Sequence, residues 1–166
     1  VYTIEMLMNQ ASITIHDRKV VDAALEYEKK TNGPAAAIEL HDGRIITGKT
    51  SKLLGATAAM LLNALKELAG IEHSCHVISP EAIEPIQTLK TRYLGSKNPR
   101  LHTDEVLIAL SVSAASNPLA REALEQLPKL AGCQAHTSVM VSSVDIKQLK
   151  RLSIQATYEA KYEKRY

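Results

Sequence analysis

Residues 43–50 read Gly-Arg-Ile-Ile-Thr-Gly-Lys-Thr and match every fixed position of the phosphate-binding pattern G-x-x-x-x-G-K-[ST]. In that pattern the glycines let backbone N–H groups curl around phosphate oxygens, the lysine neutralises charge, and the hydroxyl holds Mg²⁺. The loop needs a strand before it and a helix after it, and the sequence predicts both, over about 35–40 and 52–68. One interpretation is therefore a nucleotide hydrolase that uses Gly43 to Thr50.

The residues between the two glycines favour a β-hairpin instead. Ile45 and Ile46 are adjacent β-branched residues at positions where a phosphate loop usually has small or polar ones. Asp42-Gly43, directly before them, is a strong turn signal between two β-prone runs. In this interpretation Gly43 adopts a positive φ and residues 44–47 form the returning strand.

The hairpin interpretation still leaves an anion site after the second strand. Gly48 would connect that strand to the following helix, and Thr50 or Ser51 would cap the helix. Lys49, Thr50 and Ser51 would then lie at a helix N-terminus, where unpaired N–H groups and the helix dipole attract anions.

A second candidate anion site is the segment 96–105, Ser-Lys-Asn-Pro-Arg-Leu-His-Thr-Asp-Glu. It places cations, a histidine and carboxylates in front of a predicted helix that Thr103 would cap. A solvated loop with a good helix cap would have the same composition. Both candidate sites could lie at one edge of a sheet, where open α/β domains usually place their crevice. The candidate ligand-binding residues of this segment are Asn98, Arg100, His102, Asp104 and Glu105.

Two groups of cysteine and histidine could hold a metal ion. Cys75 with His76, and Cys133 with His136, each precede or enter a predicted strand, so neighbouring strands could join them as a zinc site. The chain has no C-x₂-C spacing, and two cysteines that serve as small core residues explain the pattern better. We therefore expect no metal and no cofactor.

Composition limits the classes of partner. The chain has 166 residues, a formal net charge of +2, and neither Trp nor Phe, which fits one domain with an aliphatic core. Few aromatic residues means few stacking platforms for single-stranded nucleic acid, so we expect no nucleic-acid partner. The unpatterned cysteines and the lack of a signal peptide or membrane span predict a cytoplasmic protein without a membrane partner.

The order of predicted elements describes a layered α/β domain. We expect helices over about 17–31, 52–68, 80–93, 103–116, 119–130 and 145–152, and strands over about 35–40, 44–47, 76–79, 135–144 and 154–160. This order predicts an α/β/α sandwich with a mixed sheet, in which the N-terminal hairpin joins mostly parallel strands. Residues 1–16 are expected to be a linker or the remnant of a preceding domain, and residues 17–166 a single domain.

Five segments, 33–40, 46–51, 78–81, 98–105 and 125–130, together resemble a bacterial family of uncharacterised proteins, domain-of-unknown-function family 1846. The resemblance spans nearly the whole chain. It implies that the chain is the C-terminal portion of a much longer cytoplasmic protein, and an N-terminal Val1 in place of Met agrees with that. It also implies a cytidine-deaminase-like topology. The zinc motif of true deaminases is missing, so their activity does not carry over.

Three functions are open from the sequence. The first is a half-site for an anionic or phosphorylated small molecule, completed by the missing N-terminal region of the same protein. The second is a structural domain whose aliphatic surface docks onto the rest of the chain or forms a homo-oligomer. The third is the nucleotide hydrolase, which requires an open loop between Gly43 and Thr50.

Overall fold

The computed structural model describes residues 18–161, so the expected linker over 1–16 lies outside the described residues. Its sheet has the strand order β2-β1-β3-β4. The strand β1 (Ala35–Glu39) is antiparallel to β2 (Ile45–Lys49) and to β3 (Gln134–Thr137), whereas β3 is parallel to β4 (Gln155–Tyr158). The α/β class and the mixed sheet are confirmed, but among the described strands only β3 and β4 form a parallel pair. The deaminase-like topology stays a prediction.

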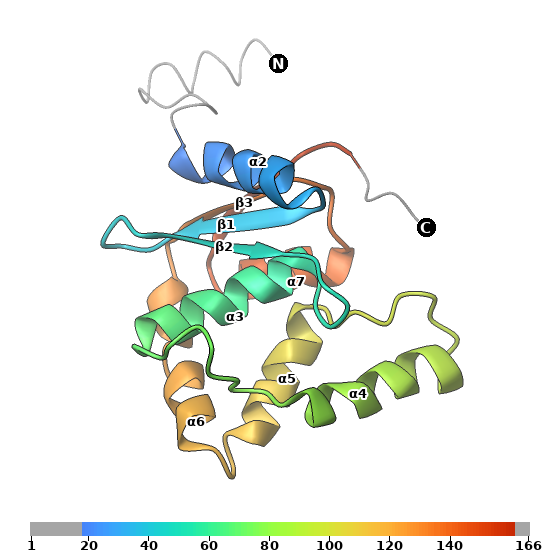
Figure 1. The fold of residues 1–166 in the computed structure, drawn as a ribbon. Coiled ribbons are helices and arrows are strands. Elements are labelled where there is room, and N and C mark those ends of the chain that lie inside the picture. Colours follow the sequence, from blue (N-terminus) through green and yellow to red (C-terminus); the bar gives the residue numbers. More distant parts are fainter. Residues whose placement is uncertain (1–17, 162–166) are drawn as a thin grey trace.

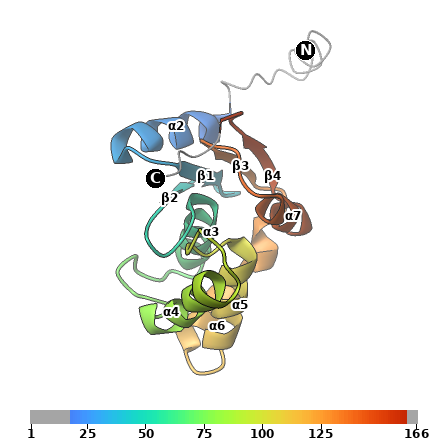
Figure 2. The same ribbon diagram turned by 90° about the vertical axis from the view of Figure 1, so that its right-hand side faces the viewer.

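Helices cover both faces of the sheet (Figure 1). Helix α2 (Lys19–Thr31) packs on one face, and α3 (Ala56–Leu68) and α7 (Ser143–Arg151) lie on the other. Beyond α3, a further helical layer contains α4 (Pro80–Thr88), its π-helical continuation η2 (Leu89–Tyr93), α5 (Thr103–Ser113) and α6 (Pro118–Leu124) (Figure 2). The 3₁₀-helix η3 (Leu127–Leu130) follows α6 in the chain and leads to β3. Among residues 18–161, no helix has the length and apolar character needed to cross a bilayer.

The core is aliphatic, as the composition predicts. Along β1, Ala36 and Ile38 belong to the large core beneath α3, whereas Ala37 packs against α2, the alternation expected of a strand covered on both faces. Helix α3 lies between the sheet and the α5–α6 layer. Its burial there explains why its sequence is apolar on nearly every side.

The segment 43–50 forms a hairpin, and the phosphate-loop interpretation is wrong. Gly43 has a φ of 90° in the turn, and β2 pairs with β1 from Glu39–Ile45 to Ala35–Lys49. The Asp42 carboxylate accepts a hydrogen bond from the Arg44 N–H at 3.0 Å and tightens the turn. Residues 45–49 are engaged in a strand ladder, so they cannot curl around phosphate oxygens.

The sequence predicts that Gly48 connects the second strand to the helix, but in the structure Gly48 lies within β2. A Cβ atom at this position would lie 2.1 Å from the backbone nitrogen of Met60. Glycine therefore allows β2 and α3 to approach closely. Helix α3 begins at Ala56 with Gly55 as its N-cap, so neither Thr50 nor Ser51 caps it. Residues 50–55 form a loop instead.

Two expected strands differ from those in the structure. Residues 76–79 form no strand; Val77 and Ile78 are buried by packing on the core and not by pairing with a neighbour. Strand β3 ends at Thr137, so residues 138–142 are a loop into α7. The N-cap of α7 is Ser142, whose hydroxyl accepts from the N–H of Asp145.

Candidate functional site

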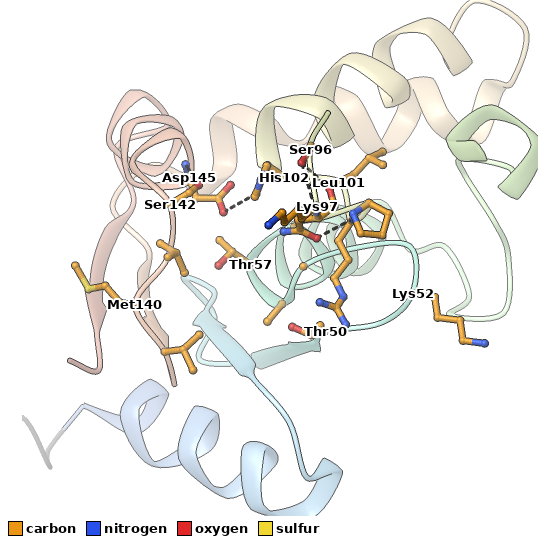
Figure 3. A pocket seen from close by; sticks show the side chains of 18 residues that line it. Thr50, Lys52, Thr57, Ser96, Lys97, Leu101, His102, Met140, Ser142 and Asp145 are labelled. Carbon is orange, nitrogen blue, oxygen red and sulfur yellow. Dashed lines mark hydrogen bonds and ion pairs between the residues drawn. The ribbon is translucent and has the colours of Figure 1, made fainter. Parts of the chain in front are cut away.

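A pocket of about 1370 Å³ opens at one edge of the sheet. Because β2 and β3 both run antiparallel to β1, their carboxyl ends meet at this edge, where α/β domains usually bind ligands. The pocket is lined by the loop that follows β2, the first turn of α3, the segment 96–102 and the loop 139–142 after β3 (Figure 3).

A short backbone pairing holds two of these segments together. Leu54 and Leu101 form an isolated parallel bridge. The Leu101 N–H donates to the carbonyl of Leu53 at 2.9 Å, and the Gly55 N–H donates to the carbonyl of Leu101 at 3.2 Å. The N-terminus of α3 is therefore fixed beside the N-terminus of α5, whose N-cap is His102 in place of the expected Thr103.

Three helix N-termini line the pocket, with Gly55, His102 and Ser142 as the N-caps of α3, α5 and α7. Side chains accept hydrogen bonds from backbone N–H groups at the N-termini of α5 and α7: Glu105 accepts from the His102 N–H at 2.8 Å, and Ser142 accepts from the Asp145 N–H. Helix α3 has no side-chain cap and no acidic residue in its first turn. Among the described residues no side chain therefore caps the N-terminus of α3, where a helix has first-turn N–H groups without partners inside the helix and the positive end of its dipole.

Thr57, in this first turn of α3, has an unusual hydroxyl. The residue is 3% exposed, and its Oγ1 atom is buried without a hydrogen-bond partner among the described residues. In Figure 3 its side chain lies among the lining groups, between those of His102 and Thr50. A buried unsatisfied hydroxyl costs a folded protein about 1–3 kcal/mol, so its position beside an uncapped helix N-terminus needs an explanation.

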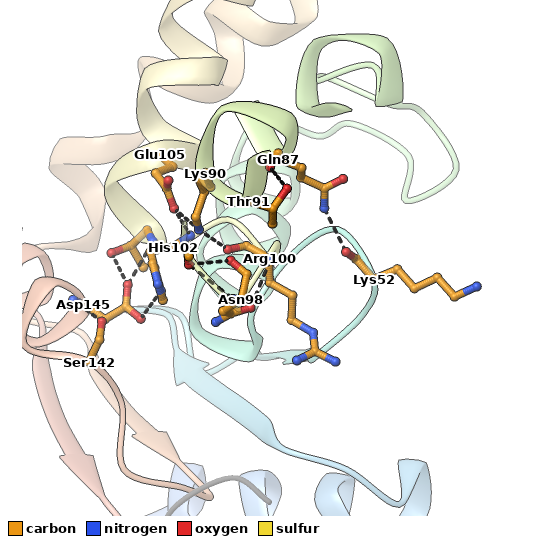
Figure 4. Close-up of polar contacts among 12 residues, drawn as sticks. Lys52, Gln87, Lys90, Thr91, Asn98, Arg100, His102, Glu105, Ser142 and Asp145 are labelled. Carbon is orange, nitrogen blue, oxygen red and sulfur yellow. Dashed lines mark hydrogen bonds and ion pairs between the residues drawn. The ribbon is translucent and has the colours of Figure 1, made fainter. Parts of the chain in front are cut away.

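His102 and Asp145 form a polar pair on the pocket wall (Figure 4). Asp145 Oδ1 accepts from the Thr103 N–H at 2.9 Å and from the Thr103 hydroxyl at 2.7 Å, and Oδ2 lies 3.5 Å from His102 Nδ1. Burial raises the pKa of Asp145, but the hydrogen bonds from His102 and Thr103 outweigh it, so that this pKa is lowered. The hydrogen bond to Asp145 raises the pKa of His102 against the opposing effect of burial.

Positive charge prevails around the pocket. Lys52, Lys97 and Arg100 contribute to the lining, together with His102, whereas Asp145 is the one carboxylate among the described lining residues. The Arg100 Nε atom donates to the carbonyl of Ser51 at 2.7 Å, which directs this side chain along the loop after β2. The lining therefore suits an anion better than a cation.

Four of the eight residues that the sequence singles out line this pocket: Thr50, Asn98, Arg100 and His102. They come from the two separate candidate segments, which the fold brings to one edge of the sheet. The Asn98 side chain is turned toward its own segment, where its Oδ1 atom accepts from the Arg100 N–H at 3.0 Å.

The other four predicted residues lie outside the lining. Lys49 is exposed at the end of β2, and the Ser51 hydroxyl accepts from two N–H groups of its own loop. Glu105 pairs with the buried Lys90 at 2.8 Å, and Lys90 also donates to the carbonyl of Arg100. Lys90 thereby joins Arg100, which lines the pocket, to Glu105 in the first turn of α5. Asp104 Oδ1 is buried without a partner among the described residues.

Sequence reasoning missed Thr57, Asp145 and the loop 139–142. Thr57 is the one residue with a hydroxyl group in the apolar run 53–65, and a lone hydroxyl in such a run is the feature of the sequence that could have identified it. The sequence predicts a helix that begins at about Asp145, whereas α7 begins at Ser143 with Ser142 as its N-cap. The apolar residues of the loop resembled a longer β3, because burial and strand pairing leave the same pattern in a sequence.

The cysteine–histidine groups do not form a metal site in the part of the chain that the structure describes, where no three His, Cys, Asp or Glu side chains could hold an ion. Cys75 is partly buried and Cys133 fully buried, and both pack on the main core. Cys133 lies too deep for a ligand on a surface site, and burial raises its pKa.

Comparison with known proteins places the chain in a family. The model for the domain of unknown function DUF1846, C-terminal, matches residues 16–166. The UPF0371 protein of Corynebacterium glutamicum (strain R) is 57% identical over 162 residues, which are 98% of this chain and 33% of that protein. The corresponding values are 59%, 98% and 33% for the UPF0371 protein of Corynebacterium efficiens, and 47%, 96% and 32% for that of Streptococcus pneumoniae.

The chain thus spans about a third of the length of these curated relatives. The family match covers every residue that lines the pocket. The chain belongs to the DUF1846 family, also called UPF0371, and corresponds to its C-terminal domain.

Proposed function

We propose that this domain contributes an anion-binding half-site to a larger protein, in which a small molecule with a phosphate or carboxylate group binds at the N-terminus of α3. The observation that carries the proposal is the Thr57 hydroxyl, which is buried and unpartnered among the described residues. An anion at this helix N-terminus would accept from the hydroxyl and from the unpaired backbone N–H groups together. A bound acceptor gives this costly arrangement a physical reason.

The charges around the pocket support the proposal. Lys52, Lys97 and Arg100 would attract an anion from solution, and the positive ends of helix dipoles would hold it once it has lost part of its hydration. The sequence placed anion binding on the segments 49–51 and 96–105. In the proposed site, Thr57 takes the place of Lys49 and Ser51 as a donor to the anion.

The rest of the ligand would be less polar than its anionic group. Pro99, Val139, Met140 and Val141 contribute apolar surface to the same pocket, and such surface favours a carbon skeleton over a second charged group. The relatives are about three times longer than the chain, so a neighbouring part of the full-length protein can supply the remaining wall. The domain on its own is then half of a site.

A second candidate function is assembly. Ile108 and Val112, one turn apart on α5, are 61% and 70% exposed, and Tyr93 and Leu94 near η2 are 70% and 71% exposed. Exposed apolar side chains of this size favour docking onto the rest of the protein or onto a second copy. Sedimentation of the full-length protein with Ile108→Glu and Val112→Glu tests this function. An unchanged mass and shape would exclude it.

The anion site is tested by titrating the full-length protein with inorganic phosphate and, separately, with acetate, using calorimetry. Thr57→Val removes the hydroxyl and keeps the side-chain volume. We expect this variant to bind the preferred anion about tenfold more weakly, because one hydrogen bond to a charged group is lost. It should also be as stable as the wild type or more stable by about 1 kcal/mol, because an unsatisfied hydroxyl disappears.

Thr31→Val is the matched control, because its hydroxyl donates to the carbonyl of Tyr27 within α2 and Thr31 does not line the pocket. It should bind the anion like the wild type. Equal affinity in the wild type and Thr57→Val would place any anion elsewhere. Saturation by neither phosphate nor acetate would refute the proposed function.

A further inference from the structure

We propose that the pocket selects a dianionic phosphoryl group over a carboxylate, and that His102, oriented by Asp145, is the residue that sets this preference. The inference rests on the proposed anion site at α3 and adds to it a ligand class and a specificity-determining residue. Its basis is the arrangement of three donor groups that line one pocket: the first turn of α3, Thr57 and His102.

The fold brings His102 to the same anion as Thr57. The hydrogen bond from the Gly55 N–H to the carbonyl of Leu101 joins the N-cap of α3 to the residue directly before His102. The first turns of α3 and α5 therefore open onto the same space, and both Thr57 and His102 line it (Figure 3). Helix α3 has 13 residues and α5 has 11, so each has a developed dipole.

Asp145 fixes the orientation of the imidazole. One carboxylate oxygen is held by the N–H and the hydroxyl of Thr103, and the other faces His102 Nδ1 (Figure 4). The His102 side chain also accepts from the N–H of Glu105 in the capping box of α5. Nε2 lies on the opposite side of the ring from Nδ1, and no ion pair joins it to a described residue. A histidine held by a carboxylate in this way keeps one ring orientation and presents its second nitrogen as a donor.

The number and charge of the donors favour a phosphoryl group. A phosphoryl group offers three acceptor oxygens in a tetrahedral arrangement, whereas a carboxylate offers two in a plane. Donors from α3, Thr57 and His102 can each take a separate phosphoryl oxygen. A protonated His102 also attracts a dianion about twice as strongly as a monoanion at equal distance, because Coulomb energy scales with charge.

Among the described residues whose charges act on the His102 imidazole, His102 itself is the group expected to titrate near neutral pH. Asp145 faces it from α7, and Glu105 lies on its own helix and pairs with Lys90 of η2; among residues 18–161 these are the charged groups that act on it. The hydrogen bond to Asp145 raises the pKa of His102, whereas the pKa of Asp145 is lowered. Lysine and arginine side chains as a class carry their charge throughout this range. A change in anion affinity between about pH 5.5 and 8.5 therefore reports on His102.

The test is calorimetric titration of the full-length protein with sulfate, a stand-in for a phosphoryl dianion whose own charge is constant between about pH 5.5 and 8.5. We expect the affinity for sulfate to fall about tenfold or more from the lower to the higher pH, because the charged donor is lost. His102→Gln should bind weakly at both values. His76→Gln, a substitution of an exposed histidine, should keep the pH dependence of the wild type.

The outcomes separate this inference from the proposed function. If sulfate binds with the same affinity at both pH values, or if His102→Gln keeps the pH dependence, His102 does not set the preference although the anion site stands. If acetate binds as tightly as sulfate at the lower pH, the phosphoryl preference is wrong. If no anion binds, the proposed function itself fails. Should His102→Gln unfold, His102→Asn restores a good N-cap residue to α5 and takes its place.

Discussion

Replacing Gly48 with alanine tests the close contact on which the hairpin interpretation depends. The new Cβ atom would lie 2.1 Å from the Met60 nitrogen, 2.6 Å from the Met60 Cα atom and 2.7 Å from the carbonyl carbon of Ala59. These are backbone atoms of α3, so no side-chain rotation can relieve the overlap. Heavy atoms in contact are optimally about 3.5–4.0 Å apart, so β2 and α3 must separate by about 1 Å.

The expected loss of stability follows from that separation. Overpacking a core costs about 1–3 kcal/mol, and a rigid contact between two backbones belongs at the upper end of this range. Alanine also restricts the unfolded chain, which returns about 0.4–1 kcal/mol. The net loss is about 2 kcal/mol or more, a large part of the roughly 5–15 kcal/mol that stabilises an ordinary domain.

Urea unfolding followed by far-ultraviolet circular dichroism measures this loss. Gly33→Ala is the matched control, because nothing lies within 4 Å of its added Cβ and no positive φ is required there. It should unfold within about 0.5 kcal/mol of the wild type. If Gly48→Ala unfolds at the same urea concentration as Gly33→Ala, the packing of β2 against α3 is not what selects glycine.

Three further changes test the framework around the site. Arg18→Lys should lower the free energy of unfolding by about 1–3 kcal/mol in urea titrations, because the guanidinium donates four hydrogen bonds to residues of β3 and β4 that one ammonium cannot replace. Asp145→Asn should lower the pKa of His102 in an NMR titration, since the hydrogen bond to this carboxylate is the main cause of its elevation; an unchanged His102 pKa would contradict the pairing. Burial lowers the pKa of His136, so from about pH 6.5 downward the unfolded chain binds a proton that the folded chain does not. Stability should therefore fall as the pH drops through that value, and His136→Asn should remove this part of the dependence in unfolding titrations between about pH 5 and 8.

Local signals explain which parts of the fold the sequence could predict. The Asp42-Gly43 turn and the following β-branched pair specify the hairpin within a few residues, and the turn geometry then fixes the register of β1 and β2. The expected strand over 76–79 rested on apolar character alone. Val77 and Ile78 are indeed buried, at 1% and 5% exposure, but apolar character reports burial and says nothing about a pairing partner.

The site could be predicted only in part, because its lining comes from segments that meet through long-range packing. The segments 49–51 and 96–105 each carried a local charge signal, but the bridge between Leu54 and Leu101 that joins them leaves no mark in the sequence. Thr57 resembles any other residue of a buried helix until the fold shows that its hydroxyl has no partner among the described residues.

The misleading phosphate-loop motif is explained by the same geometry. Each of the last three residues of the motif has its own place in the fold. Gly48 lets α3 approach β2 closely, Lys49 is the exposed last residue of β2, and Thr50 lines the pocket. None of these roles involves a nucleotide, so Lys49→Ala should leave both stability and anion binding unchanged, whereas Thr57→Val should weaken anion binding. A motif that lies next to a ligand pocket can therefore match a pattern for ligand binding while the binding groups, here at the N-termini of α3 and α5, come from other parts of the chain.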